Sequence, residues 1–135
     1  MTDSNSRSAK HFSSPPLVTH MYTADPSAHV FEGKIYIYPS HDVEGGVPFN
    51  DDGSHFCMED YHVFSMDKPF GEVTDHGLAL SVNDVPWAAR QMWAPDCTEK
   101  DGKYYFYFPA KDPDDVFRLG VAVGDRPEGP FEPQP

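Results

Sequence analysis

Two runs of aromatic and β-branched residues stand out along the chain, KIYIY at 34–38 and KYYFYF at 103–108. Each run follows an acidic residue and a glycine, at 32–33 in the first case and at 101–102 in the second. An acidic-Gly pair before such residues is typical of a hairpin turn that leads into a strand. Because both runs are apolar on both faces, they predict strands that are covered on each side.

The two runs belong to a longer repeat. Pro26 matches Pro95 and Tyr36 matches Tyr105, and both pairs are separated by the same 69 positions. Each unit therefore contains a proline, a short strand, an acidic-Gly turn and a long aromatic strand. High aromatic content (14%) together with frequent proline and glycine also favours short strands joined by turns over a helical bundle.

The similarity continues downstream of the aromatic runs. YHVFS at 61–65 resembles FRLGVAV at 117–123, and each is followed by a polar turn and a closing segment, at 71–73 and 129–131. Four short strands per unit is the pattern of a β-propeller blade. Since two blades cannot bury all their faces, the sequence predicts an all-β fold that forms the first two four-stranded antiparallel blades of an incomplete ring, either truncated or completed by another chain.

The predicted organisation has three parts: a disordered polar lead-in over 1–15, blade 1 over 16–80 and blade 2 over 81–135. Blade 1 contains an insertion at 41–59 rich in Gly, Asp, Asn and His, which fits either a plain surface loop or a functional one. The segment at 81–92 joins the blades, and we expect one helical turn over 84–90.

Charge narrows the range of partners. The chain has 22 acidic against 10 basic residues and a formal net charge of -12, which disfavours nucleic acid and anionic membranes as partners. A neutral ligand such as a sugar is compatible with this charge. The N-terminus lacks the apolar region of a secretory signal, so we expect a cytoplasmic protein in which Cys57 and Cys97 are reduced packing groups.

Two acidic motifs occupy matching places in the repeat. Asp25 precedes Pro26, which we expect to bias it to an extended conformation, with its carboxylate at the mouth of the propeller channel. In unit two, Trp93 offers a flat apolar face for a sugar ring, and Asp96 can accept hydrogen bonds from hydroxyls. The alternatives are a turn-forming Asp25 and a core Trp93 with a capping Asp96. Because both motifs fall at matching positions of the repeat, we expect both to face the same propeller axis. Carboxylates that flank a bound sugar there would suit glycoside hydrolysis.

These motifs resemble a known family. YTADPS at 22–27 with GKIYIY at 33–38, followed by MWAPD at 92–96 and GKYYFY at 102–107, resembles the N-terminal part of glycoside hydrolase family 43. The resemblance covers about residues 16–135. It implies a five-bladed β-propeller and an inverting enzyme that cleaves arabinofuranosyl or xylosyl linkages in plant-type glycans.

The resemblance also implies roles for individual residues. Asp25 corresponds to the general base, and Trp93 lies at the sugar subsite. His41 and Asp42, just after the first long strand, approach the sugar, and Asp60 matches an acidic position near the site. The family's pKa-tuning Asp lies in the third blade and its general-acid Glu lies later still, so we expect this chain to be inactive alone.

Two other functions remain open from the sequence: a non-catalytic carbohydrate-binding propeller fragment, and an assembly role in which exposed blade faces self-associate. No cofactor is expected, although the resemblance leaves room for a calcium ion in the complete propeller. The seven histidines form no metal-binding motif, so the sequence predicts no metal ligands, and His29 and His62 are expected to be packed within strands. The acidic clusters at 50–53 and 112–115 lack EF-hand spacing and predict turns.

Overall fold

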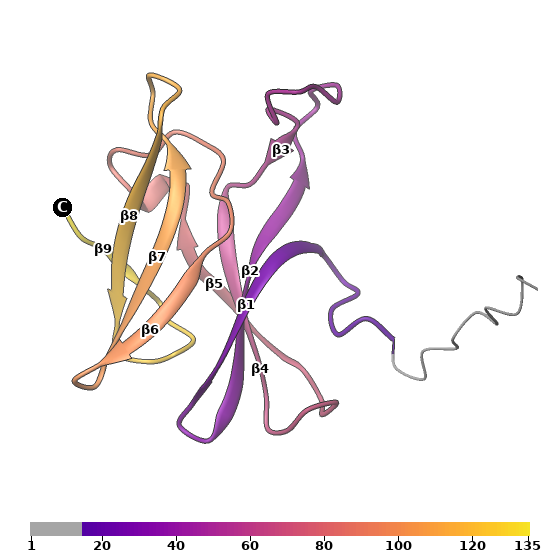
Figure 1. Cartoon of the computed structure of the whole chain (residues 1–135), viewed down its shortest axis with the longest axis vertical. Helices are drawn as coiled ribbons and strands as arrows, with labels where there is room; N and C mark the ends of the chain where they lie inside the picture. Colours follow the sequence, from indigo (N-terminus) through magenta and orange to yellow (C-terminus); the bar gives the residue numbers. More distant parts are fainter. Residues whose placement is uncertain (1–14) are drawn as a thin grey trace, which may run out of the picture.

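The aromatic runs at 34–38 and 103–108 lie in inner strands of two antiparallel sheets (Figure 1). The structure is a computed structural model that describes residues 15–135, so the lead-in predicted over 1–15 falls almost entirely outside the described residues. The strands of sheet 1 are β1 (Tyr22–Phe31), β2 (Lys34–Glu44), β3 (Phe56–Cys57), β4 (Asp60–Met66) and β5 (Thr74–Ser81). Those of sheet 2 are β6 (Asp96–Lys100), β7 (Lys103–Lys111), β8 (Phe117–Gly124) and β9 (Glu132–Pro133). The strand orders are β1-β2-β4-β5, with β3 paired to β2, and β6-β7-β8-β9.

Tight turns join the first two strands of each sheet. Glu32 and Gly33 have φ of +51° and +76°, and Asp101 and Gly102 have φ of +54° and +78°. Positive φ at both central residues belongs to the type I′ turn, whose twist matches that of the flanking strands. The two predicted hairpins are therefore confirmed, and so is the all-β fold class.

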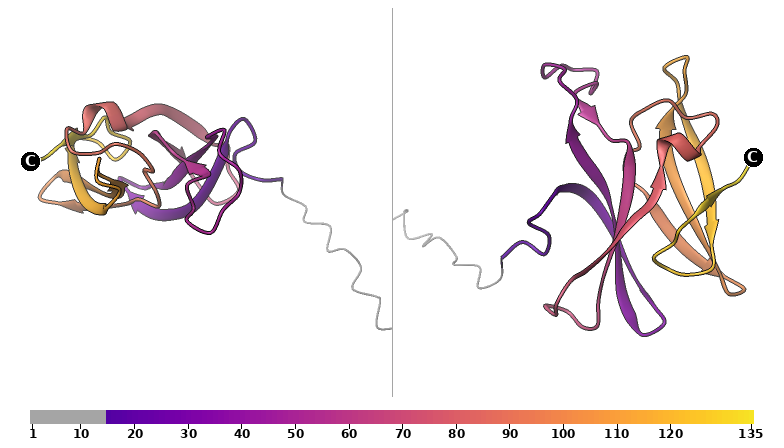
Figure 2. Two further views of the ribbon diagram at one scale, coloured as in Figure 1. Left: turned by 90° about the horizontal axis from the view of Figure 1, so that it is seen from above. Right: turned by 180° about the vertical axis from the view of Figure 1, so that it is seen from behind.

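The two sheets share one aromatic core, and Figure 2 shows them side by side from two further directions. Tyr38 and Tyr61 of sheet 1 and Phe106 and Phe108 of sheet 2 are fully buried. The Tyr61 and Phe106 rings meet edge to face, with their centroids 5.0 Å apart. The Tyr38 hydroxyl donates to the carbonyl oxygen of Pro127 in the turn before β9, at 2.6 Å, so this buried polar group is satisfied. Burial of these large rings stabilises the packing of sheet 1 on sheet 2.

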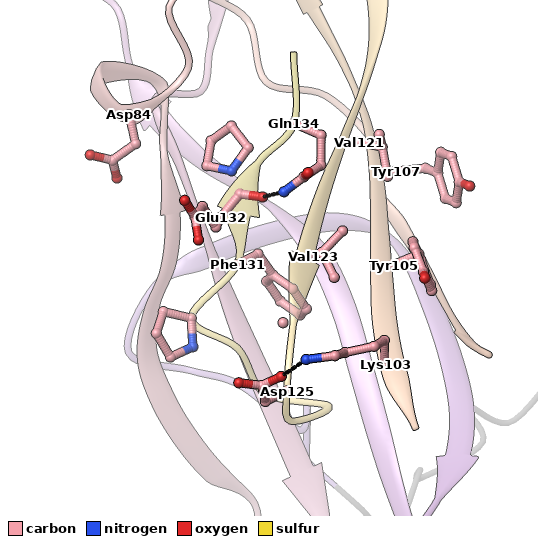
Figure 3. Close-up of a pocket in the computed structure, with 13 residues that line it drawn as sticks. Asp84, Lys103, Tyr105, Tyr107, Val121, Val123, Asp125, Phe131, Glu132 and Gln134 are labelled. Atoms are coloured by element: carbon pink, nitrogen blue, oxygen red, sulfur yellow. Dashed lines mark hydrogen bonds and ion pairs between the residues drawn. The ribbon is translucent and has the colours of Figure 1, made fainter. Parts of the chain in front are cut away.

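The opposite face of sheet 2 is open within residues 15–135. Alternation along β7 places Phe106 and Phe108 in the core but leaves Tyr107 42% exposed, and Leu119 of the neighbouring β8 is 74% exposed. The expectation that the run at 103–108 is covered on both faces is therefore wrong for the described residues. A hollow of about 870 Å³ lies over this face (Figure 3). Its lining includes Tyr105, Tyr107, Val121, Val123 and Phe131.

The connections differ in part from the sequence predictions. A 3₁₀ helix spans Val82–Asp84 and is capped by Ser81, whose hydroxyl accepts from the Asn83 backbone N–H at 3.2 Å. The helical turn predicted over 84–90 is wrong, because Pro86 holds the preceding Val85 in an extended conformation that ends the helix. No helix within residues 15–135 is long and apolar enough to cross a membrane.

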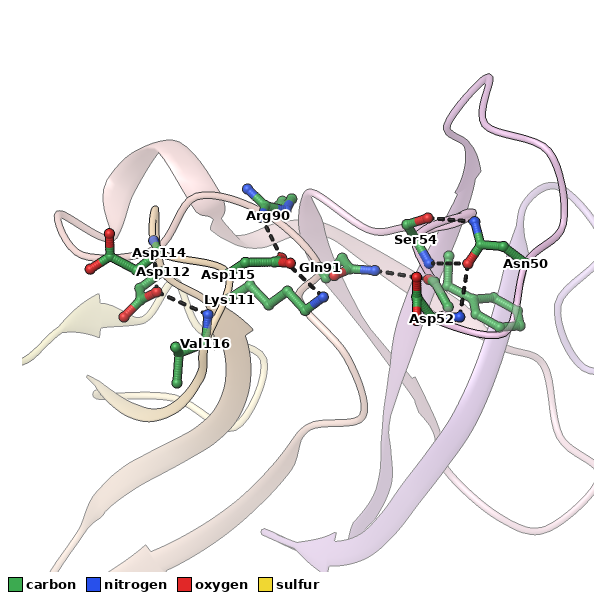
Figure 4. A network of polar contacts seen from close by, with 12 residues as sticks. Asn50, Asp52, Ser54, Arg90, Gln91, Lys111, Asp112, Asp114, Asp115 and Val116 are labelled. Carbon is green, nitrogen blue, oxygen red and sulfur yellow. Dashed lines mark hydrogen bonds and ion pairs between the residues drawn. The ribbon is translucent and has the colours of Figure 1, made fainter.

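The predicted insertion at 41–59 is only partly a loop. β2 continues through its first residues to Glu44, and β3 pairs with β2 through Val43 and Cys57. The tip is held as a turn by Asn50, whose side-chain oxygen accepts from the backbone N–H groups of Asp52 and Ser54 (Figure 4). The turns predicted at 50–53 and 112–115 are confirmed, since the Asp112 carboxylate accepts from backbone N–H groups in the same manner.

The two cysteines are both free thiols. Cys97 is buried in the shared core, and this burial raises its pKa to about 11. Burial also raises the pKa of Cys57. Because the thiolate is the reactive form, both residues act as packing groups at neutral pH.

Candidate functional site

Asp25 lies at a bulge in the edge strand of sheet 1. The register between β1 and β2 shifts between Ala24 and Ser27, so Asp25 and Pro26 form an irregularity in the pairing. Asp25 has φ of +46° and is exposed to solvent. The expectation of an extended Asp25 is wrong, because the bulge turns this residue, which lies within β1, into the left-handed region. Such strained residues cluster at functional sites.

Three of the predicted site residues line one pocket. Asp25, Asp42 and Trp93 face a hollow of about 180 Å³ that is completed by Ala24, Phe56 and Met58. The carboxylate of Asp42 accepts a hydrogen bond from the Ser40 hydroxyl at 3.1 Å, which orients it. Pockets for drug-sized ligands are typically about 300–1,000 Å³, so the size of this one suits a single small ring.

Trp93 is held in place from several sides. Its carbonyl oxygen accepts from the Tyr61 hydroxyl at 2.7 Å, and its indole N–H donates to the carbonyl oxygen of Phe56 at 3.3 Å. The Phe117 ring lies against it, with centroids 4.5 Å apart. Gly53 has φ of +71°, and a Cβ there would approach the indole to 3.2 Å. The loop before β3 therefore requires glycine at this point, and the indole has a defined position.

The segment before β6 is also tied to the loop of sheet 1. The buried Gln91 side chain donates from Nε2 to the Gly53 carbonyl oxygen at 2.8 Å (Figure 4). The Met92 backbone N–H donates to the Met58 carbonyl oxygen at 3.0 Å. These bonds bring Phe56 and Met58 into the pocket. Sequence analysis missed both residues as site residues, and their place in the suspected insertion was the one signal for them.

The pocket has the chemistry of a site for hydroxyl groups. Asp25 and Asp42 contribute two carboxylates, while no Lys or Arg is among the lining residues. Carboxylates accept hydrogen bonds from hydroxyls, and the flat ring of Trp93 beside them can stack on the apolar face of a sugar. An anionic ligand would meet uncompensated negative charge here.

His41 and Asp60 do not line this pocket. Because successive side chains of a strand alternate, His41 points to the face of β2 opposite Asp42. There His41 Nδ1 lies 2.5 Å from Asp60 Oδ1, and the ring of His62 packs edge-on against that of His41 with centroids 5.2 Å apart. His62 lies within β4, as predicted, and is partly buried.

Asp96 is likewise outside the pocket. It begins β6, and its carboxylate contacts His29 Nε2 of β1 at 2.6 Å and accepts from the Cys97 backbone N–H at 2.8 Å. Burial acts to raise the pKa of Asp96, but hydrogen bonds, foremost that from His29, hold it below its usual value. The two matching motifs do lie side by side, since β1 contacts β6, but Trp93 and Asp96 face different surroundings.

Comparisons with known proteins agree on one family. The family model described as Glycosyl hydrolases family 43 matches residues 14–134. A xylosidase/arabinosidase 43A of Humicola insolens is 63% identical over 122 residues, which are 89% of this chain and 37% of that protein. A xylosidase/arabinosidase of Bacteroides ovatus is 60% identical, over 87% of this chain and 37% of that protein. The chain thus spans a little over a third of the length of these relatives.

Solved structures give the same result. CoXyl43, a GH43 β-xylosidase/α-arabinofuranosidase from a compost microbial metagenome, solved with xylotriose in a calcium-free form, superposes with a TM-score of 0.87. It is 68% identical, over 89% of this chain and 36% of that chain. The GH43_1 enzyme of Xanthomonas citri complexed with xylotriose has a TM-score of 0.81 at 60% identity, over 90% of this chain and 34% of that chain.

Proposed function

The chain belongs to glycoside hydrolase family 43. We propose that it supplies part of the sugar-binding site of an enzyme that cleaves xylosyl or arabinofuranosyl linkages in plant-type glycans. The observation that supports this most directly is the shared pocket of Asp25, Asp42 and Trp93. The chain is the N-terminal part of such an enzyme, judged by the share of its relatives that it matches. The xylotriose complexes of similar enzymes point to the same class of substrate.

In the proposed mechanism, Asp25 is the general base of an inverting reaction. Its carboxylate takes a proton from a water molecule that attacks the anomeric carbon, while a carboxylic acid on the other side protonates the leaving oxygen. Inversion requires roughly 6.5–9.5 Å between the two carboxyl groups, which leaves room for that water. The acid and the Asp that tunes it come from the part of the enzyme outside this chain, so the chain alone does not turn over substrate.

Within the pocket, Trp93 stacks on the sugar ring and Asp42 accepts hydrogen bonds from its hydroxyls. Sugar-binding roles for His41, Asp60 and Asp96 stay predictions, since these residues lie outside the pocket. A contact between these residues and the sugar would require either a longer substrate or a site completed by the rest of the enzyme.

The two sheets are proposed to be the first two blades of a five-bladed propeller. Support comes from the open face of sheet 2, where Tyr107 lines the hollow of about 870 Å³ (Figure 3) and Tyr107 and Leu119 are both exposed. A further blade packed on this face would bury these apolar groups in the same way that sheet 1 buries Phe106 and Phe108. The pattern of exposure thus agrees with a ring that continues from sheet 2.

Calcium does not fit the residues described here. The one group of three His, Cys, Asp or Glu residues within 15–135 whose ligand atoms converge is His41, Asp60 and His62. Calcium takes six to eight oxygen ligands, whereas two of these three residues offer nitrogen. Calcium in the complete propeller stays a prediction, and it would require ligands from the rest of the enzyme.

Expression of the complete reading frame tests the proposed function. We expect hydrolysis of aryl xylosides or aryl arabinofuranosides, and ¹H NMR early in the reaction should show the released sugar with inverted anomeric configuration. Retained configuration would contradict Asp25 as general base. Binding of xylo-oligosaccharides without hydrolysis would instead identify a carbohydrate-binding protein.

Replacement of Trp93 by alanine should raise KM about tenfold, because loss of a stacking face costs about 1.4 kcal/mol of sugar binding. Steady-state kinetics of the complete enzyme on an aryl xyloside measures this. Trp87→Ala is the matched control, since Trp87 stacks on Phe108 in the core, with centroids 5.9 Å apart, and does not line the pocket. Equal KM changes in the two variants would mean that Trp93 acts through packing alone.

A further inference from the structure

The face of sheet 1 opposite the sugar pocket brings together three side chains that can bind a metal ion. His41 lies on β2, and Asp60 and His62 lie on β4. One ligand atom from each residue lies within 4.8 Å of the others. This geometry follows from strand pairing: β2 and β4 pair antiparallel with Ile37 opposite Phe64, and the same register continued along the strands places His41 opposite Asp60. His62, two residues after Asp60, projects from the same face.

A neighbouring carboxylate orients one of these ligands. Asp75 of β5 contacts His62 Nδ1 through Oδ1 at 3.1 Å, and its other oxygen, Oδ2, lies 2.8 Å from His20 Nε2. A carboxylate at Nδ1 fixes the proton of the imidazole on that nitrogen and leaves Nε2 with its lone pair available to a ligand. Metal-binding histidines commonly have this arrangement, in which the carboxylate also raises the basicity of the ring.

The surroundings of the cluster suit a bound ion. The side chains of His41, Asp60 and His62 are 20%, 29% and 18% exposed, so the ligands are mostly dehydrated but still reachable from solvent. His41 Nδ1 and Asp60 Oδ1 lie 2.5 Å apart, whereas two tetrahedral ligands of one zinc ion lie about 3.3 Å apart, so these atoms would separate by about 0.8 Å to admit the metal.

We propose that His41, Asp60 and His62 bind a divalent transition-metal ion, for which zinc is the probe, and that Asp75 positions His62. Two imidazole nitrogens and one carboxylate oxygen form a donor set that zinc accepts at about 2.0–2.2 Å. Three protein ligands leave the fourth tetrahedral position for water or for a group from the rest of the enzyme. The site is separate from the sugar pocket, because it lies on the other face of β2, and the proposal does not rest on the proposed hydrolase activity.

The ion would link β2 to β4 near the ends of these strands, where their regular pairing has stopped. The pairing between β2 and β4 extends only to Ile37 and Phe64, while both strands run on past this point. A metal that joins His41 to Asp60 and His62 would fix these strand ends, and with them the neighbouring Asp42 of the sugar pocket. Zinc should therefore raise the thermal stability of the protein.

Metal analysis of the complete protein tests the site. The chelator-stripped protein is dialysed against zinc chloride, and bound zinc is measured by mass spectrometry. We expect the wild type to bind one more zinc ion per chain than an Asp60→Asn, His62→Gln double variant. Asp75→Asn should weaken zinc binding about 10–100-fold, as expected when the partner of a ligating histidine is lost. His29→Gln, which removes a histidine–carboxylate pair without a third ligand, should bind zinc as the wild type does.

A second measurement uses the wild type alone, so it does not depend on whether the variants fold. Cobalt added to the stripped wild type should give visible absorption bands of a nitrogen-ligated site, zinc should remove them, and calcium at the same concentration should not. Equal zinc content in the wild type and the double variant, or cobalt bands absent in the wild type, would overturn the proposal. In that case the cluster would be a hydrogen-bonded network alone.

Discussion

Replacement of Asp25 by asparagine should lower kcat/KM of the complete enzyme about 10²–10⁴-fold, the range that a positioned general base contributes. Asparagine is the informative substitution here because of the backbone. Asp25 has φ of +46°, a conformation that asparagine tolerates well, so the bulge in β1 is preserved while the negative charge and the proton acceptor are lost. The variant thus separates chemistry from folding.

The pH dependence of this variant provides a second readout. A profile of kcat/KM against pH reports the essential base of the free enzyme in its acidic limb. We expect this limb to disappear in Asp25→Asn, while KM changes little. Asp67→Asn is the matched control, since Asp67 lies in the turn after β4 and pairs only with Lys34 among the described contacts. Full activity in Asp25→Asn, with an unchanged profile, would show that another group is the base.

Local sequence signals were sufficient for much of the fold. The acidic-Gly pairs at 32–33 and 101–102 allow positive φ at both turn residues, and this geometry alone sets the hairpins β1-β2 and β6-β7. The aromatic runs that follow favour strands with at least one buried face. The two faces of those strands could not be told apart in advance, because the residues that cover Phe106 come from sheet 1 and are distant in sequence.

Site residues that lie in a recognisable sequence motif could be predicted. Site residues that depend on contacts between segments distant in the sequence could not. Asp25, Asp42 and Trp93 were found from their motifs and the resemblance, and the structure brings them to one pocket. Met58 reaches it through a backbone bond from Met92, and Phe56 through a bond from the Trp93 indole N–H, and these bonds leave no pattern in the sequence.

The cluster of His41, Asp60 and His62 shows the same limit. Metal-binding motifs are recognised by spacing along one segment, whereas these ligands are assembled across two paired strands, and their proximity depends on the register between β2 and β4. The D-x-H spacing at 60–62 was the available signal, because residues two apart in a strand share a face.

The shared core makes a second large effect predictable: Phe106→Ala should lower the free energy of unfolding by about 3–5 kcal/mol. Phe106 is fully buried and lies between the sheets, with its ring centroid 5.0 Å from that of Tyr61 and 4.7 Å from that of Phe131. Truncation removes the ring from both contacts and leaves a cavity that the two sheets cannot close without shifting against each other. Urea unfolding of the complete enzyme, followed by tryptophan fluorescence, measures the change.

Phe70→Ala makes the same chemical change at the surface and is the matched control. Phe70 is 84% exposed in the turn before β5, so its removal should change the free energy of unfolding by no more than about 0.5 kcal/mol. A loss below about 1 kcal/mol in Phe106→Ala would contradict a common core for the two sheets. The expected large loss should also weaken sugar binding, because Asp25 lies on sheet 1 and Trp93 lies just before sheet 2, so the pocket exists only while the sheets remain packed together.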